Sequence, residues 1–171
     1  KIVKKIRSSI ILMGAVLQRT GNVEVAYPGG CEIGLRPIDL HLKGLRKLGV
    51  EITEKNGLLV GTIKEPVGCE IHLDYPSVGA TENVMLFAVG NPGRTVIYNP
   101  AREPEIVDLQ DFLNTCGFCV SGAGTGTITI EGKKPENTDT VEYKIISDRI
   151  EAGTYLSAAA SMKSKIYIRN I

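Results

Sequence analysis

The chain has 171 residues, 43% of them hydrophobic, with 20 Lys and Arg against 19 Asp and Glu. The charge of the chain is nearly balanced, and its basic residues form no stripe interleaved with aromatic residues, which argues against a nucleic-acid partner. No apolar run approaches the roughly 18 residues of a membrane span. We therefore expect one sizeable globular domain, or one domain and part of another, with no nucleic-acid or membrane partner.

The first 66 residues predict two helices and three strands. Apolar periodicity and the Gly and Pro positions indicate a helix at 8–18, a strand at 22–27, a helix at 37–48 and a hairpin at 50–63. Pro37 suits the first position of its helix, where a missing N–H group costs nothing.

Residues 69–132 predict a β-α-β-α-β-β unit. Thr81 is the expected early cap of the first helix, and Pro104 and Gly117 mark the start and the end of the second. The expected elements are a strand at 69–74, a helix at 79–90, a strand at 95–99, the helix from Pro104 to Gly117, and a hairpin around the Gly-rich turn 122–126.

A polar stretch at 133–140 separates this unit from a third segment. Its hydrophobic pattern predicts a strand at 141–146, a helix at 150–161 and a strand at 165–170. This order matches only the first half of the unit at 69–132.

An internal repeat links these segments. At an offset of 68 to 72 residues, Gly21 aligns with Gly93 and Gly49 with Gly117, which indicates a duplicated supersecondary unit. We expect one domain at 1–132, made of a partial unit at 1–66 and a full unit at 69–132, and the start of a second domain at 141–171. Because the outer units are incomplete and the first residue is not Met, we expect a fragment of a longer protein.

Cysteines provide the first chemical signal. The chain has four, Cys31, Cys69, Cys116 and Cys119, too few for a secreted disulfide framework of this length, so we expect a reducing, cytoplasmic location. Cys31 stands in "AYPGGCEIGLRPIDL", where the surrounding Gly and Pro residues exclude a regular helix or strand. That loop presents the thiol, although a lone loop cysteine is more often not catalytic.

The stretches "PGGCEIGLRPIDLHLKGLRKLG", "DYPSVGATEN", "AREPEIVDL", "SGAGTGTITIEG" and "DRIEAGTYLSAAA" carry a resemblance. Together, and in this order, they resemble the UDP-N-acetylglucosamine 1-carboxyvinyltransferases of the enolpyruvyl transferase family. The resemblance implies an α/β (α+β) fold of repeated β-α-β-α-β-β units, as in the family's inside-out α/β barrel, here incomplete. It also implies the small-molecule partners phosphoenolpyruvate and UDP-N-acetylglucosamine, and the first committed step of peptidoglycan synthesis.

The resemblance assigns Cys31 the catalytic role. Transfer of the enolpyruvyl group requires protonation of a vinyl carbon, which is a weak base and needs a positioned acid. The family uses the matching cysteine as this acid, forms an adduct through its thiolate, and is alkylated there by fosfomycin. Arg36 would bind the phosphate of phosphoenolpyruvate as a bidentate fork, and Arg7 would reach the same anionic cleft.

The resemblance places the UDP-sugar at two helix starts. Pro37, Ile38, Asp39 and Leu40 match a stretch that binds the nucleotide, although simple helix capping also explains these residues. "SVG" at 77–79 matches a diphosphate site, where Tyr75 stands in place of a lysine that several relatives carry. The implied substrate-binding residues are Arg7, Arg36, Pro37, Ile38, Asp39, Leu40, Ser77, Val78 and Gly79.

Other motifs leave alternatives open. "CGFC" at 116–119 has the spacing of a redox centre, but a helix is expected to end there rather than begin. His41, expected on the exposed side of a helix, and His72 have no second ligand at metal spacing, so we expect no metal and no cofactor. The alternatives to the transferase are a non-catalytic module of the same fold that binds UDP-sugars or anions, and a CxxC redox protein. We expect the isolated chain to lack transferase activity and to self-associate.

Overall fold

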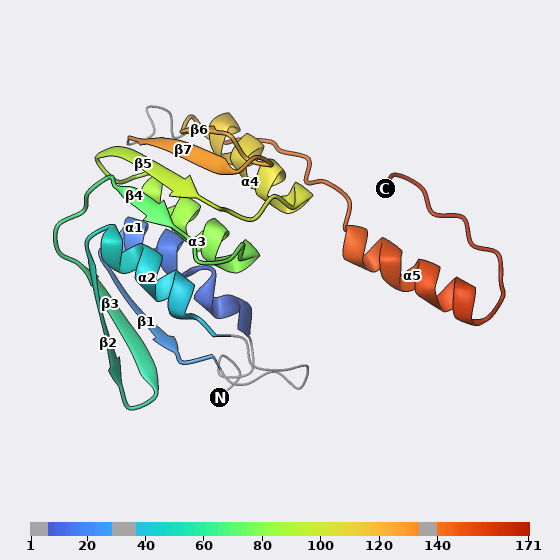
Figure 1. Ribbon diagram of the computed structural model, residues 1–171, viewed down its shortest axis with the longest axis horizontal. Coiled ribbons are helices and arrows are strands. Elements are labelled where there is room, and N and C mark those ends of the chain that lie inside the picture. Colours follow the sequence, from blue (N-terminus) through green and yellow to red (C-terminus); the bar gives the residue numbers. More distant parts are fainter. Residues whose placement is uncertain (1–6, 29–36, 134–139) are drawn as a thin grey trace. The chain divides into compact units, whose positions relative to one another are not determined.

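The computed structural model describes residues 7–28, 37–133 and 140–171 (Figure 1). The chain forms two compact units, Lys1–Val141 and Glu142–Ile171, which we describe separately. Across the described ranges, every helix falls short of the length and apolar character that crossing a bilayer needs.

The first sheet of unit Lys1–Val141 has three antiparallel strands in the order β1-β3-β2. Helix α1 packs on β1 and β3, and helix α2 packs on β2. The elements in chain order are the 3₁₀ helix η2 (Arg7–Ile10), α1 (Met13–Thr20), β1 (Asn22–Ala26), α2 (Asp39–Lys47), β2 (Val50–Lys55) and β3 (Leu58–Ile63).

The second sheet has four strands in the order β4-β5-β7-β6. β4 runs parallel to β5, whereas β7 is antiparallel to both β5 and β6. The elements in chain order are β4 (Glu70–His72), α3 (Val78–Ala88), β5 (Gly93–Tyr98), α4 (Pro104–Thr115), β6 (Cys119–Ser121) and β7 (Thr127–Gly132).

The two sheets repeat one arrangement. The order β5-β7-β6 reproduces β1-β3-β2, and α3 and α4 take the chain positions of α1 and α2. The aligned glycines behave alike: φ is +75° at Gly21 and +88° at Gly93, and +91° at Gly49 and +88° at Gly117. Glycine adopts this left-handed conformation without steric cost, which explains its use where α1, α2 and α4 end and, at Gly93, where β5 begins.

Helix α3 is the centre of this unit. It packs against α1, α2 and α4 and against strand β7, and Figure 1 shows α1, α2 and α3 between the two sheets. Val84, Met85 and Phe87 are completely buried although they point in different directions around the helix. A helix that is apolar on most sides is a core helix.

The structure corrects two predicted helix starts. Thr81 is not a cap: it is fully buried, and its hydroxyl accepts a hydrogen bond from the N–H group of Ala101 at 3.1 Å. Ser77 caps α3 instead, because the helix begins at Val78. Helix α2 begins at Asp39, so Pro37 precedes the helix and does not occupy its first position.

Unit Glu142–Ile171 contains one helix, α5 (Arg149–Ser161), whose cap Asp148 accepts hydrogen bonds from the N–H groups of Ile150 and Glu151. The predicted strands at 141–146 and 165–170 are wrong, since neither described segment forms a strand. A strand requires a ladder of backbone hydrogen bonds with a neighbour. Ser147, which follows the first segment, instead donates a side-chain hydrogen bond to the Asn170 carbonyl.

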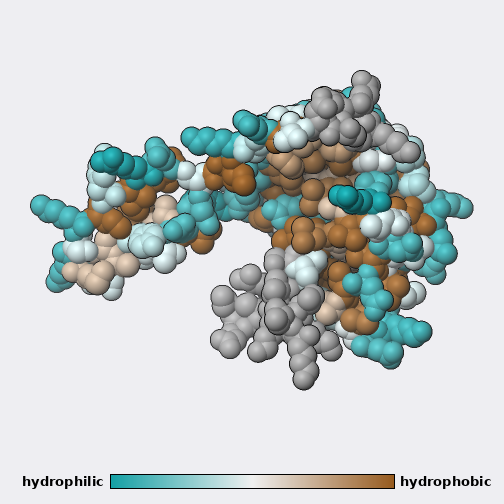
Figure 2. Space-filling view, turned by 180° about the vertical axis from the view of Figure 1, so that it is seen from behind, coloured by the Kyte–Doolittle hydropathy of each residue, from teal (hydrophilic) through white to brown (hydrophobic). Residues whose placement is uncertain are grey.

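Large apolar side chains lie on the surface of this second unit, where Figure 2 shows brown atoms at the left of the view. Contiguous exposed apolar surface favours association between molecules. The exposed residues are Ile145, Ile146, Ile150, Tyr155, Leu156, Met162, Ile166, Tyr167 and Ile171.

We predict concentration-dependent self-association through this surface. Met162 is 70% and Tyr167 81% exposed, so replacing both by Gln should shift the chain toward monomer in sedimentation velocity. Lys163→Arg with Lys165→Arg is the matched control on the same segment. A wild-type chain that sediments as a monomer at every concentration would contradict this prediction.

Candidate functional site

The predicted site residues are Arg7, a group at 31–40 and a group at 77–79. The structure describes some of them. Arg7 begins the 3₁₀ helix η2. Cys31 and Arg36 lie outside the described residues. The remaining residues stand at the starts of α2 and α3, and the geometry of the site is therefore that of these two helix starts.

At the start of α2, alternate side chains face the core and the solvent. Ile38 and Leu40 are 3% and 2% exposed and belong to the hydrophobic core, whereas Pro37 and Asp39 are exposed. Ile38 is the N-cap of α2, and its apolar side chain makes no capping hydrogen bond. The first N–H groups of a helix have no partner within the helix itself and can face a ligand, and Asp39 adds a negative charge beside them.

The start of α3 is capped and carries no acidic residue in its first turn. Ser77 has an extended backbone, and its Oγ accepts a hydrogen bond from the N–H group of Ala80 at 3.4 Å. Val78 and Gly79 are half-buried. No carboxylate of the first turn therefore offsets the positive end of the helix dipole, which suits an anion.

The two helix starts touch through a glycine and a histidine. A Cβ atom on Gly79 would lie 3.0 Å from Cε1 and 3.3 Å from Nε2 of His41, closer than ordinary van der Waals contact. The missing side chain thus lets the first turn of α3 approach the ring on α2. The segments at 37–40 and 77–79, which the sequence analysis assigned to one substrate, lie next to each other.

Asn83 connects the residues that follow Arg7 to the starts of α2 and α3. Its side chain is completely buried. Its Oδ1 accepts from the N–H group of Gly14 at 2.6 Å, and its Nδ2 donates to the carbonyl of Ile10 at 2.9 Å and lies 3.1 Å from Nδ1 of His41. One carboxamide therefore connects α3 to α2 and to the chain that follows Arg7.

Sequence reasoning missed this polar cluster. His41 was expected on the exposed side of its helix, but it is 6% exposed, because α3 covers that side of α2. Asn83 stands in "ENVMLFAV", and a carboxamide within such an apolar run is the signal that could have identified it, since buried polar groups require partners.

A carboxylate next to Asn83 has a shifted pKa. Glu82 on α3 is half-buried, and burial raises the pKa of its carboxyl, as does the negative charge of Glu105 on α4. Charged groups of like sign that share a partly desolvated region oppose each other's ionisation. The ionised form of Glu82 therefore opposes folding.

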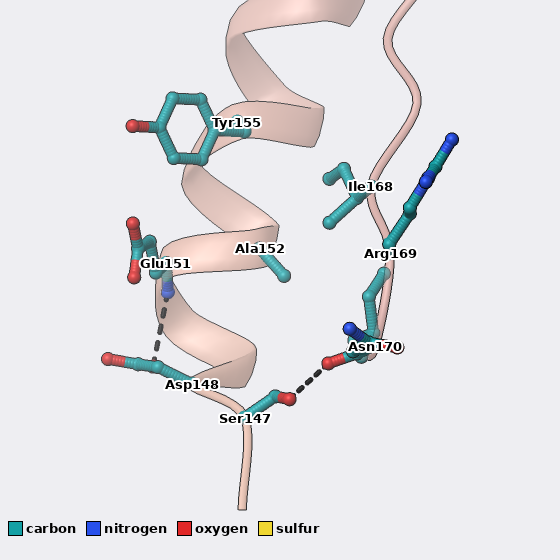
Figure 3. Close-up of a pocket in the computed structure, with 9 residues that line it drawn as sticks. Ser147, Asp148, Glu151, Ala152, Tyr155, Ile168, Arg169 and Asn170 are labelled. Atoms are coloured by element: carbon teal, nitrogen blue, oxygen red, sulfur yellow. Dashed lines mark hydrogen bonds between the residues drawn. The ribbon is translucent and has the colours of Figure 1, made fainter.

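Two surface hollows have linings that contain none of the described site residues, although Pro76 in the lining of one directly precedes Ser77. One, of about 380 Å³, is lined by Pro76, Asn99, Arg102 and Glu103. The other, of about 400 Å³, lies in unit Glu142–Ile171 between α5 and the last residues of the chain. In Figure 3, Ile168 points toward α5 and Arg169 projects away from it. Both hollows are open to solvent.

The three described cysteines differ in environment. Cys116 and Cys69 are half-buried, but Cys119 is exposed. Burial raises the pKa of the Cys69 thiol, with Lys47 opposing the shift. Cys116 ends α4, so "CGFC" has the predicted position at a helix C-terminus. Among the described residues, no group of His, Cys, Asp and Glu is placed to hold a metal ion.

Comparison with known proteins defines the class. All 171 residues match the family model described as EPSP synthase (3-phosphoshikimate 1-carboxyvinyltransferase), and the chain belongs to this family. The enolpyruvyl transferase NikO from Streptomyces tendae superimposes with a TM-score of 0.75 at 25% identity, covering 90% of this chain and 36% of NikO. EPSP synthase from Acinetobacter baumannii gives 0.62 at 20% identity, with 90% and 34% covered. The predicted fold class is confirmed.

Curated relatives narrow the class further. UDP-N-acetylglucosamine 1-carboxyvinyltransferase 2 of Caldanaerobacter subterraneus subsp. tengcongensis is 56% identical over 98% of this chain, and transferase 1 of the same organism is 50% identical over all 171 residues of this chain. The predicted resemblance is confirmed. The chain spans about 40% of the length of these relatives.

We predict that Glu82→Gln stabilises the fold more at neutral than at acidic pH. A raised carboxyl pKa means that the contribution of Glu82 to stability is present below its unfolded pKa and lost as pH rises through its folded pKa. Gln keeps the shape without the charge, so urea unfolding at pH about 7 and about 4 should show a larger gain at the higher value. Exposed Glu54→Gln is the control, and an equal gain at both pH values contradicts the prediction.

We also predict an order of cysteine labelling. At limiting iodoacetamide, Cys31 should react first, followed by exposed Cys119, with Cys69 last because its raised pKa keeps it protonated. Labelling of Cys69 should accelerate only above the ordinary thiol pKa. Mass-mapped labelling tests the order, and Cys119→Ser removes the main competitor. Modification of Cys116 or Cys119 before Cys31 would favour the redox alternative.

Proposed function

We propose that this chain is part of a UDP-N-acetylglucosamine 1-carboxyvinyltransferase. The observation that carries the proposal is the contact between the starts of α2 and α3 at His41 and Gly79, in a chain that is 50–56% identical to transferases of that name over 98–100% of its length. This contact supports one continuous site for a ligand that has both a polar ring and a diphosphate.

The two helix starts differ in charge, and the difference supports a division of the ligand between them. Exposed Asp39 at α2 disfavours an anion and suits the N–H edge of a uracil ring, together with Pro37 and the backbone of Ile38 and Leu40. The first turn of α3 has no acidic residue, so the backbone of Val78 and Gly79 and the Ser77 hydroxyl suit the diphosphate.

The reaction joins the enolpyruvyl group of phosphoenolpyruvate to the 3′-hydroxyl of the sugar. The hydroxyl oxygen bonds to C2 and loses its proton, while C3 gains a proton. From the resulting tetrahedral intermediate C3 loses a proton, the C2–O bond to phosphate breaks, and the vinyl ether forms. We assign Cys31 the role of general acid toward C3, with Arg36 and Arg7 neutralising phosphate and lowering the pKa of the thiol.

The proposed reaction places the parent protein at the first committed step of peptidoglycan synthesis. It would act in the cytoplasm, in cell-wall formation, cell shape and cell division. It would be a target of fosfomycin through alkylation of Cys31. No resident cofactor is assigned.

The experiment that tests the proposal is a chimera. These 171 residues should replace the matching 40% of the Caldanaerobacter transferase that is 56% identical. The chimera should release phosphate from phosphoenolpyruvate only when UDP-N-acetylglucosamine is present, and Cys31→Ala should abolish release. A chimera that folds and binds both substrates but releases no phosphate would contradict the proposal.

We predict that the isolated 171-residue chain releases no phosphate. Stabilisation of the transition state by preorganised groups supplies most of such catalysis, and one cysteine with two arginines is a small part of what a two-substrate reaction requires. Phosphate release by the isolated chain above a Cys31→Ala control would overturn this prediction. If the chain binds UDP-N-acetylglucosamine without turnover, it behaves as the binding module considered from the sequence.

A further inference from the structure

We propose that Asn83 is a positioning residue for the UDP-sugar site. It holds His41 in a single tautomer and thereby fixes the first turns of α2 and α3 against each other. The inference rests on the proposed function for its substrate, but its geometry comes from the described residues alone.

Two backbone groups fix the orientation of the Asn83 carboxamide. The N–H group of Gly14, which can only donate, lies 2.6 Å from Oδ1. The carbonyl of Ile10, which can only accept, lies 2.9 Å from Nδ2. Exchanging the oxygen and the nitrogen would set two donors together at Gly14 and two acceptors together at Ile10. The orientation is therefore determined by chemistry.

This orientation determines the protonation of His41. One hydrogen on Nδ2 of Asn83 serves the Ile10 carbonyl, and the other points to Nδ1 of His41 at 3.1 Å. Nδ1 must then be an acceptor, which requires the neutral ring with its hydrogen on Nε2. A ring with hydrogen on Nδ1 would set two N–H groups against each other in a buried site.

The fixed ring links the two halves of the proposed ligand site. His41 follows Leu40 directly, and its Cε1 and Nε2 edge faces the position of the missing Cβ on Gly79. Moving or flipping the ring would change the spacing between the first turn of α2 and the first turn of α3. Because a nucleotide and its diphosphate are covalently joined, this spacing must match the ligand.

A second buried asparagine provides a matched control. Asn91 is 1% exposed; its Nδ2 donates to the carbonyls of Leu48 and Val67, and its Oδ1 accepts from Gln18. It therefore resembles Asn83 in burial and number of hydrogen bonds. It follows α3, whereas the proposed ligand site lies at the start of α3.

The test compares the wild-type chain with Asn83→Asp and Asn91→Asp. The chain has two histidines, so a His72→Gln background leaves His41 as the single imidazole signal. Long-range proton–nitrogen NMR spectra should show hydrogen on Nε2 and a bare Nδ1 in the wild type and in Asn91→Asp. In Asn83→Asp, a carboxylate faces Nδ1, and the spectrum should show hydrogen there.

Titration with UDP-N-acetylglucosamine gives the second readout. We expect Asn83→Asp to weaken binding by about tenfold or more, and Asn91→Asp to change it less than about twofold, at temperatures where the variants are equally folded. Gly79→Ala, which displaces the ring without touching Asn83, should also weaken binding. It supplies a second variant if Asn83→Asp does not fold.

The outcomes separate the two proposals. Hydrogen on Nδ1 of His41 in the wild type overturns the positioning role, as does equal loss of binding in Asn83→Asp and Asn91→Asp. If the wild-type chain does not bind UDP-N-acetylglucosamine, the proposed ligand of this site is wrong. In that case the His41 spectra and the backbone shifts of the first turns of α2 and α3 still decide whether Asn83 positions them.

Discussion

The packing of the helices depends on one buried carboxamide, that of Asn83. A polar group buried without partners costs several kcal/mol relative to water, so α3 can occupy the core only when Asn83 meets Gly14, Ile10 and His41 together. The apolar residues around α3 would tolerate rotation of the helix about its axis. Three hydrogen bonds of fixed polarity do not, and they select one rotation.

Close approach of the helices makes this network possible. A Cβ atom on Gly14 would overlap the Asn83 carbonyl oxygen and come within 2.7 Å of its Oδ1, and one on Gly44 would come within 2.5 Å of Cγ2 of Val84. α1 and α2 each therefore present a glycine to α3, which places the backbone N–H of Gly14 within reach of a short side chain. Glycine inside a helix costs about 1 kcal/mol relative to alanine, and here the satisfied buried amide offsets that cost.

Local sequence signals predict the repeated framework well and the tertiary contacts poorly. Pro104 and Gly117 bound α4 because each acts through its own backbone conformation, which needs no partner. The burial of His41 depends on α3, which lies some 40 residues further along the chain.

The segments 141–146 and 165–170 have a strand pattern, but a strand forms only where a neighbouring strand completes its ladder of hydrogen bonds. Cys119 lies on the exposed side of a short strand, and the sequence does not indicate which side that is.

The sequence predicts the part of the candidate site that is formed by helix starts, because local signals locate where a helix begins. Ser77 illustrates why capping and binding do not compete: its oxygen accepts from the N–H of Ala80, and its own hydrogen is still available to donate to an anion. With exposed Tyr75 where several relatives are expected to carry a lysine, the proposed diphosphate contacts shift from a mobile ammonium group to groups fixed by the backbone. Fixed donors lose little entropy on binding, but they tolerate no error in position. A site of this kind depends on the rotation and the spacing of its helices, and Asn83 and His41 set both.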